Sequence, residues 1–126
     1  MLTAVEDTGI EFSNDLTNTT QLNILNYLYF YNGAGTAIAD FNNDGLEDIY
    51  FTGNQVSDKL YLNQGSFKFK DISAEAGITN NNWNTGVTAV DINADGLLDI
   101  YICTVSGHLD LKGHNKLYIN QGIKDG

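Results

Sequence analysis

Two nine-residue stretches of the sequence are rich in side chains that carry oxygen ligands. They read DFNNDGLED (residues 40–48) and DINADGLLD (residues 91–99), so both follow the pattern D-x-N-x-D-G-L-x-D. Oxygen atoms at loop positions one, three and five can converge on one cation, and the glycine at position six permits the sharp turn that this requires. The carbonyl of position seven can then point inward, and the aspartate at position nine closes the shell. The expected ligands are Asp40, Asn42, Asp44, Leu46 and Asp48 in the first loop, and Asp91, Asn93, Asp95, Leu97 and Asp99 in the second.

A ligand set made only of oxygen selects a hard cation, and flexible, high coordination favours Ca²⁺ over Mg²⁺. We therefore expect two Ca²⁺ ions, one in each loop. Without an ion, the three carboxylates of each loop would repel one another. The alternative is a pair of Asp/Asn-rich hairpin turns without metal, since such turns are common.

An EF-hand is the obvious competing calcium motif, and the sequence excludes it. An EF-hand needs a bidentate glutamate at loop position twelve and flanking helices. Position twelve is Phe51 in the first loop and Ile102 in the second, and both flanks resemble strands.

Both loops occupy the same place in an internal repeat. Residues 35–52 (GTAIADFNNDGLEDIYFT) match residues 86–103 (GVTAVDINADGLLDIYIC), 51 positions later. Residues 59–65 (KLYLNQG) match residues 116–122 (KLYINQG), 57 positions later. The second copy therefore contains about six extra residues around 106–114, which we expect to form a loop.

The runs that flank the loops predict strands. Short β-prone runs precede and follow each loop, the KLY segments form a third run, and Phe67–Ile72 (FKFKDI) alternates apolar and polar residues as a fourth. Residues 73–77 (SAEAG) predict one helical turn with a glycine stop. A repeat of this length fits a four-stranded antiparallel β-propeller blade, so the predicted fold class is all-β.

The repeat also predicts the domain organisation. Residues 1–34 are a lead-in segment with the tail of a preceding blade, residues 35–78 a complete blade, and residues 79–126 a second, incomplete blade. Two blades cannot close a ring, so we expect a fragment of a larger propeller, or a unit that pairs with further blades.

These segments resemble the FG-GAP/VCBS repeat family, which includes the calcium-binding blades of integrin α-chains and the cartilage-acidic-protein-like proteins. The resemblance covers roughly residues 33–122 and implies a secreted or cell-surface β-propeller with further blades in cis. It places the ion ligands on the ten loop positions named above. The FG-GAP dipeptides are replaced here by GAGTAIADF and NTGVTAVDI, and no partner identity carries over from integrins.

The charge balance excludes several partner classes. The chain has 126 residues, with 16 acidic against 6 basic ones, a net charge of −10, and no arginine. Nucleic acid is excluded because it requires clustered basic residues, and anionic membrane surfaces are disfavoured by the same sign. The single cysteine, Cys103, excludes an intrachain disulfide framework; it aligns with Thr52, so we expect a small buried residue. No signal-peptide pattern follows Met1, so the protein is either cytosolic or a piece of a larger one.

Several other residues have two interpretations. The aromatic run Ile24–Tyr31 is a sugar-stacking surface or, as we favour, a buried strand or plug between blades. Trp83 is a candidate for stacking against a ligand such as a sugar, and otherwise caps the core. His108, Asp110 and His114 lie in the insertion and are candidates for a second metal site or an acid/base pair. Asn63 and Asn120 are expected to serve turns.

The function expected from these features is a calcium-binding module that mediates adhesion, or binding of a glycan or protein ligand, at a cell surface. We predict no catalytic residue. The alternatives are the propeller part of a polysaccharide-degrading enzyme, which would draw on the histidines of the insertion, and a purely structural scaffold.

Overall fold

A computed structural model describes residues 7–122 of the chain. Within this range the protein consists of antiparallel strands and turns with no helix, which confirms the predicted all-β class. None of the described residues forms a helix long and apolar enough to cross a membrane. The strands are β1 (Thr36–Ala39), β2 (Asp48–Phe51), β3 (Lys59–Asn63), β4 (Phe69–Asp71), β5 (Asn84–Val90), β6 (Asp99–Thr104), β7 (Ser106–His108), β8 (Leu111–Lys112) and β9 (Lys116–Tyr118).

The first repeat copy forms a four-stranded sheet in the order β1-β2-β3-β4. Its strands follow the predicted runs, but β4 begins at Phe69, two residues later than the alternating pattern indicates. Ser66 and Phe67 adopt left-handed backbone angles (φ 50° and 57°), so the start of the run belongs to the turn. The predicted helical turn at residues 73–77 appears as a hydrogen-bonded turn, in which the amide of Ala76 donates to the carbonyl of Ile72 (2.9 Å).

The second copy forms a three-stranded sheet in the order β5-β6-β9. The insertion, predicted to be a loop, instead pairs with itself as the β7–β8 hairpin. Gly107 and Leu109 have positive φ angles (74° and 50°), which turn the chain back on itself within this short hairpin.

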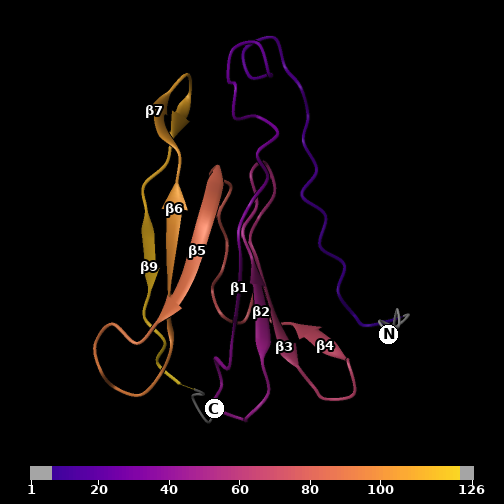
Figure 1. The fold of residues 1–126 in the computed structure, drawn as a ribbon, viewed down its shortest axis with the longest axis vertical. Helices are drawn as coiled ribbons and strands as arrows, with labels where there is room; N and C mark the ends of the chain where they lie inside the picture. Colours follow the sequence, from indigo (N-terminus) through magenta and orange to yellow (C-terminus); the bar gives the residue numbers. More distant parts are fainter. Residues whose placement is uncertain (1–6, 123–126) are drawn as a thin grey trace.

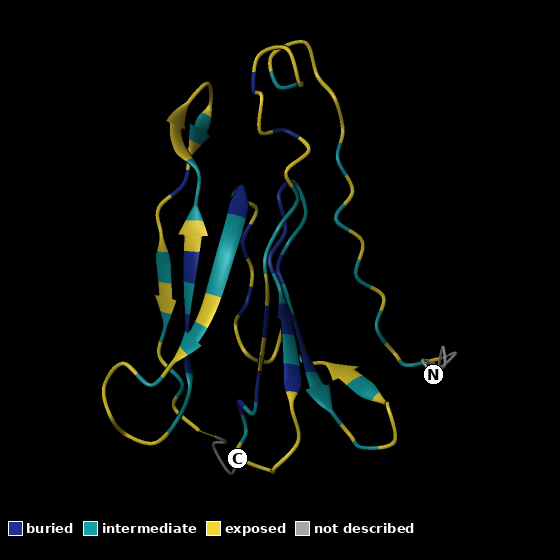
Figure 2. Cartoon of the chain, viewed as in Figure 1, coloured by how far each residue is buried: buried dark blue, intermediate teal, exposed yellow. Residues whose placement is uncertain are grey.

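The two sheets pack against each other through one apolar face each (Figure 1). Alternation of side chains along a strand divides each sheet into two faces. The contributing face of the first sheet carries Ala37, Ala39, Tyr50 and Leu60, and that of the second carries Ile100 and Ile102. The sheets approach closely at Gly35, because a Cβ atom there would lie 2.9 Å from the carbonyl oxygen of Thr85. Buried residues accordingly concentrate between the sheets (Figure 2). The four-stranded and three-stranded sheets of residues 7–122 do not close into a ring.

The lead-in segment runs along the other face of the first sheet (Figure 1). Phe12 stacks on Phe51 with ring centroids 4.9 Å apart, and the amide of Phe69 donates to the carbonyl of Thr8 (2.8 Å). The two nine-residue loops lie together at the lower end of the molecule in Figure 1, far from the aromatic part of the lead-in at the upper end.

Candidate metal centre

The first loop connects β1 to β2 and gathers the side chains of positions one, three and five. The amide of Asp44 lies 3.1 Å from Oδ1 of Asp40 and 3.2 Å from Oδ1 of Asn42. The amide of Gly45 donates to the second carboxylate oxygen of Asp40 (2.8 Å), and Nδ2 of Asn42 donates to Oδ2 of Asp44 (2.9 Å). Three of the predicted ligands therefore lie next to one another around the loop backbone.

The second loop repeats this arrangement bond for bond. The amide of Asp95 lies 3.1 Å from oxygens of both Asp91 and Asn93, and the amide of Gly96 donates to Asp91 (2.9 Å). Nδ2 of Asn93 donates to Asp95 (2.8 Å). Because both copies show the same bonds although positions two, four and eight differ, we attribute the geometry to the residues that the two loops share.

Left-handed backbone angles at two positions close each loop. The position-six glycines, Gly45 and Gly96, have φ angles of 85° and 87°, which other residues adopt at a cost of about 1–2 kcal/mol. Position four is also left-handed, with φ 57° at Asn43 and 60° at Ala94. Asparagine tolerates this region, whereas alanine does not favour it, so the second loop contains more strain than the first.

The position-nine aspartate serves a different task from the other carboxylates. Asp48 is fully buried, and its two oxygens accept the amides of Phe41 (2.9 Å) and Asn63 (2.8 Å). Burial raises the pKa of Asp48; the two amide bonds lower it, and the charges of Asp44 and Asp40 raise it further. Predicted as an ion ligand, Asp48 also ties the start of the loop to the end of β3.

Asp99 has the same role in the second copy. It is fully buried and accepts the amides of Ile92 (3.1 Å) and Asn120 (2.8 Å). At position seven, where a carbonyl ligand is predicted, the amides of Leu46 and Leu97 donate to the position-five carboxylates at 2.8 and 2.9 Å.

The asparagines of the two NQG turns contribute more than the turn chemistry predicted for them. Oδ1 of Asn63 accepts the amide of Gly65 (2.9 Å), as expected of a turn, while its Nδ2 donates to the carbonyl of Glu47 (3.0 Å). Nδ2 of Asn120 donates to the carbonyl of Phe41 in the other repeat copy (2.7 Å). In the sequence, this contact between the asparagine and a nine-residue loop is indicated by the recurrence of KLY[LI]NQG together with each loop.

The chemistry of the gathered side chains fits a hard cation in each loop. Each of the side chains at positions one, three and five offers an oxygen atom as a ligand, from a carboxylate or from the carbonyl of an asparagine amide. In the conformation of residues 7–122, no three Asp, Glu, His or Cys side chains are grouped as a metal site. The carboxylates instead accept the amides of their own loops, as in the metal-free alternative. The residues that could hold an ion are the side chains at positions one, three and five, with position nine behind them.

The other candidate residues are placed apart from the loops. Trp83 is 3% exposed and lies against Tyr27 and Phe30, with ring centroids 5.5 and 5.4 Å apart, so it caps a second core and offers no free face to a ligand. The aromatic run is divided, because Tyr27 and Phe30 are buried while Tyr29 and Tyr31 are exposed.

The insertion does not assemble a catalytic group. The side chains of His108, Asp110 and His114 are exposed, and no hydrogen bond or ion pair among the described residues joins them. His108 instead contacts the carbonyl of Asn26 (3.0 Å). Cys103 was expected to be buried and is exposed. Its counterpart Thr52 is fully buried, and it lies two positions after Tyr50, on the face of the first sheet that packs against the second. Cys103 directly follows Ile102, so it lies on the opposite face of the second sheet from the buried Ile100 and Ile102.

A buried polar network between the repeat copies escaped the sequence analysis. Asp58 is fully buried and accepts hydrogen bonds from Tyr50 Oη (2.8 Å), Gly53 N (2.8 Å), Asn80 Nδ2 (2.9 Å) and Asn84 Nδ2 (2.9 Å). Asn80 and Asn84 follow the first sheet in sequence, so this carboxylate links the two copies. These donors satisfy the hydrogen-bonding capacity of the buried carboxyl oxygens, as burial of a polar group requires.

The two copies carry different residues at the position of Asp58, and this difference is visible in the sequence. Asn115, the counterpart of Asp58, accepts the amide of Thr104 (2.9 Å) and donates to the hydroxyl of Tyr101 (2.9 Å). The pair of Tyr101 and Asn115 thus repeats the pair of Tyr50 and Asp58, but on the surface. Aligning the copies beyond the two obvious motifs would have pointed to it.

Comparison with known proteins gives one match. The family model described as an FG-GAP-like repeat matches residues 40–102, a span that contains both nine-residue loops. No curated protein and no solved structure matches the chain.

Proposed function

Because the chain belongs to the FG-GAP-like repeat family, we propose that it is a calcium-binding β-propeller module of a secreted or cell-surface protein, which mediates adhesion or binds a glycan or protein ligand. The observation that carries this proposal is the identical hydrogen-bonded arrangement of the two loops, in which the oxygen-bearing side chains of Asp40, Asn42 and Asp44 are matched by those of Asp91, Asn93 and Asp95. Further blades in cis are the partners expected for such a module.

The loop residues would act on the ion and on the strands at the same time. Calcium supplies the positive charge that offsets the mutual repulsion of the loop carboxylates. Asp40 and Asp44 would hold it, and Asp48 would keep the loop fixed to Asn63 through its buried amide bonds. The ion would therefore stiffen the β1–β2 connection, and its counterpart the β5–β6 connection.

The acidic surface supports an extracellular binding role over contact with nucleic acid or insertion into a membrane. A net charge of −10 without arginine opposes phosphate-rich partners and suits a medium with millimolar calcium.

Thermal unfolding with calcium, magnesium and a chelator tests the proposal. Sites in extracellular modules have dissociation constants of roughly 10⁻⁴–10⁻³ M. At about ten times that concentration, each site should stabilise the folded state by about 1.4 kcal/mol. Equal melting temperatures in saturating calcium and in chelator would contradict it.

A structural scaffold is the second candidate, and the direct packing of one sheet on the next favours it. Glycan-array screening with the full chain separates the two, because a scaffold would respond to calcium and bind no glycan. An enzyme would need carboxylates or histidines paired across a cleft. The dispersed candidates of the insertion give this alternative no support.

A further inference from the structure

The two nine-residue loops, which lie together at the lower end of the molecule, are joined by side-chain hydrogen bonds (Figure 1). Nδ2 of Asn120 donates to the carbonyl of Phe41 in the first loop (2.7 Å) and to the carbonyl of Leu98 in the second (3.2 Å). A side-chain amide carries two hydrogens, so it can make both bonds at the same time. Nδ2 of Asn43, in the first loop, makes a longer contact with the carbonyl of Gly96 in the second (3.4 Å). The backbones of the two loops are therefore held to each other as well as to their own strands.

The carbonyls that Asn120 holds lie next to predicted ion ligands. Phe41 is position two of the first loop, between the ligands of positions one and three. Leu98 is position eight of the second loop, between the ligands of positions seven and nine. Asn120 is itself fixed, because its backbone amide donates to Asp99 (2.8 Å) and its Oδ1 accepts the amide of Gly122 (3.0 Å). A restraint on the ligands of one loop can therefore reach the ligands of the other through this side chain.

The equivalent asparagine of the first copy, Asn63, provides a contrast within the same chain. Its Nδ2 donates to the carbonyl of Glu47 (3.0 Å), which is position eight of the first loop. Within residues 7–122, its side chain makes no hydrogen bond to the second loop. Each asparagine thus holds position eight of the loop in its own copy, and Asn120 alone of the two also holds the loop of the other copy.

We propose that Asn120 couples the two loops, so that calcium bound in one loop raises the calcium affinity of the other. This inference rests on the proposed calcium binding and concerns how the two sites regulate each other. Binding in one loop restrains the carbonyl that Asn120 holds there, and through Asn120 it restrains the backbone of the other loop. The second loop then has less conformational entropy to lose when it binds its own ion, which produces positive cooperativity.

The charge of the ions acts in the opposite direction. A Ca²⁺ ion in one loop reduces the negative charge that attracts the next ion, so by charge alone it lowers the affinity of the other loop. At about 0.15 M salt this effect is screened over about 8 Å. It does not depend on the side chain of Asn120, which is uncharged. Variants of Asn120 compared at one salt concentration therefore separate the hydrogen-bonded coupling from the effect of charge.

Calcium titrations of the full chain, followed by NMR, measure the coupling. The amides of Gly45 and Gly96 donate to the aspartates at position one of their own loops, so their shifts report on the two loops separately. A joint fit of the two curves gives the affinity of each loop and the factor by which one bound ion raises the affinity for the other. In the unmodified chain this coupling factor should be about five, at the lower end of the usual range for coupled sites. Asn120→Ala should abolish it, because only the effect of charge then remains.

Asn63→Ala is the matched control. It removes the bond to position eight of its own loop, as Asn120→Ala does, but it leaves the bridge between the loops in place. The first loop should bind calcium more weakly in this variant, and the coupling factor should stay as in the unmodified chain. Asn43→Ala supplies a second test should Asn120→Ala fail to fold, because an alanine already occupies the equivalent position of the second loop with φ 60° at Ala94. It removes the longer contact between the loops and should lower the coupling factor in part.

The outcomes distinguish this inference from the proposed function. Independent binding by the two loops of the unmodified chain would overturn the coupling and leave calcium binding intact. A coupling factor that survives Asn120→Ala, or that falls equally in Asn63→Ala, would overturn the role of Asn120. If calcium shifts neither Gly45 nor Gly96, the proposed calcium binding is wrong and the coupling is overturned with it.

Discussion

The buried carboxylate of Asp48 accepts the backbone amide of Asn63 at 2.8 Å, and through this bond the candidate ion loop is fixed to a strand 15 residues further along the chain. The second oxygen of Asp48 accepts the amide of Phe41. The same carboxylate therefore fixes both the start of the loop and the neighbouring strand, whether or not the loop holds an ion.

Replacement of Asp48 should destabilise the fold strongly. Asp48→Ala leaves two buried amides without an acceptor, and each should cost about 1–3 kcal/mol. Urea unfolding in chelator measures this without a contribution from calcium. Glu47→Ala, at the exposed neighbouring position, is the control and should change stability by less than about 0.5 kcal/mol. Similar midpoints for the two variants would show that Asp48 is no anchor.

The buried network around Asp58 should depend on Tyr50. Its hydroxyl donates to the buried carboxylate of Asp58 (2.8 Å), and burial together with that nearby charge raises the pKa of Tyr50. Tyr50→Phe removes this bond and should cost about 1–3 kcal/mol of unfolding free energy. Tyr101→Phe is a matched control from the other copy, because its partner Asn115 is exposed, and should cost less than about 0.5 kcal/mol. Equal costs would show that the buried bond from Tyr50 to Asp58 contributes no more to stability than its exposed counterpart.

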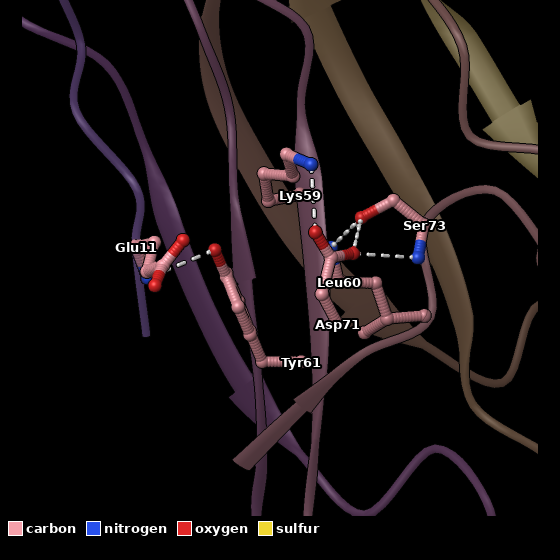
Figure 3. Close-up of polar contacts among 6 residues, drawn as sticks. All are labelled: Glu11, Lys59, Leu60, Tyr61, Asp71 and Ser73. Carbon is pink, nitrogen blue, oxygen red and sulfur yellow. Dashed lines mark hydrogen bonds and ion pairs between the residues drawn. The ribbon is translucent and has the colours of Figure 1, made fainter. Parts of the chain in front are cut away.

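The pair of Lys59 and Asp71 (Figure 3) should make the free energy of unfolding depend on pH in the acid range. Partial burial would raise the pKa of Asp71, but hydrogen bonds from Lys59 and Ser73 outweigh it and hold this pKa below its ordinary value of 3.8. The folded state then binds fewer protons than the unfolded state, so the stabilisation is present above the ordinary value and is lost as pH falls through the folded pKa. Lys59→Gln should raise the pKa of Asp71 in an NMR titration. An unchanged titration would show that Lys59 does not hold it down.

The sequence could predict what recurs within it. Periodicity and the repeated glycines identified the strands, and the spacing of the loop aspartates and asparagines identified side chains that the fold does bring together. Which residues are buried was harder to predict, because burial depends on which faces of the two sheets pack together. Cys103 and Thr52 occupy equivalent positions of the repeat, yet only Thr52 is buried. Asp58 was missed because the two donors that join it to the second copy, Asn80 and Asn84, lie 22 and 26 residues away and share no motif with it.

Native mass spectrometry in millimolar calcium tests the proposed calcium binding most directly, because it counts the bound ions. The chain should bind two, Asp44→Ala and Asp95→Ala one each, and the double variant none. Asp15→Ala, which removes an exposed carboxylate outside the loops, should retain both. If the unmodified chain binds no calcium, or if the double variant binds as much as the unmodified chain, the two loops are not calcium sites.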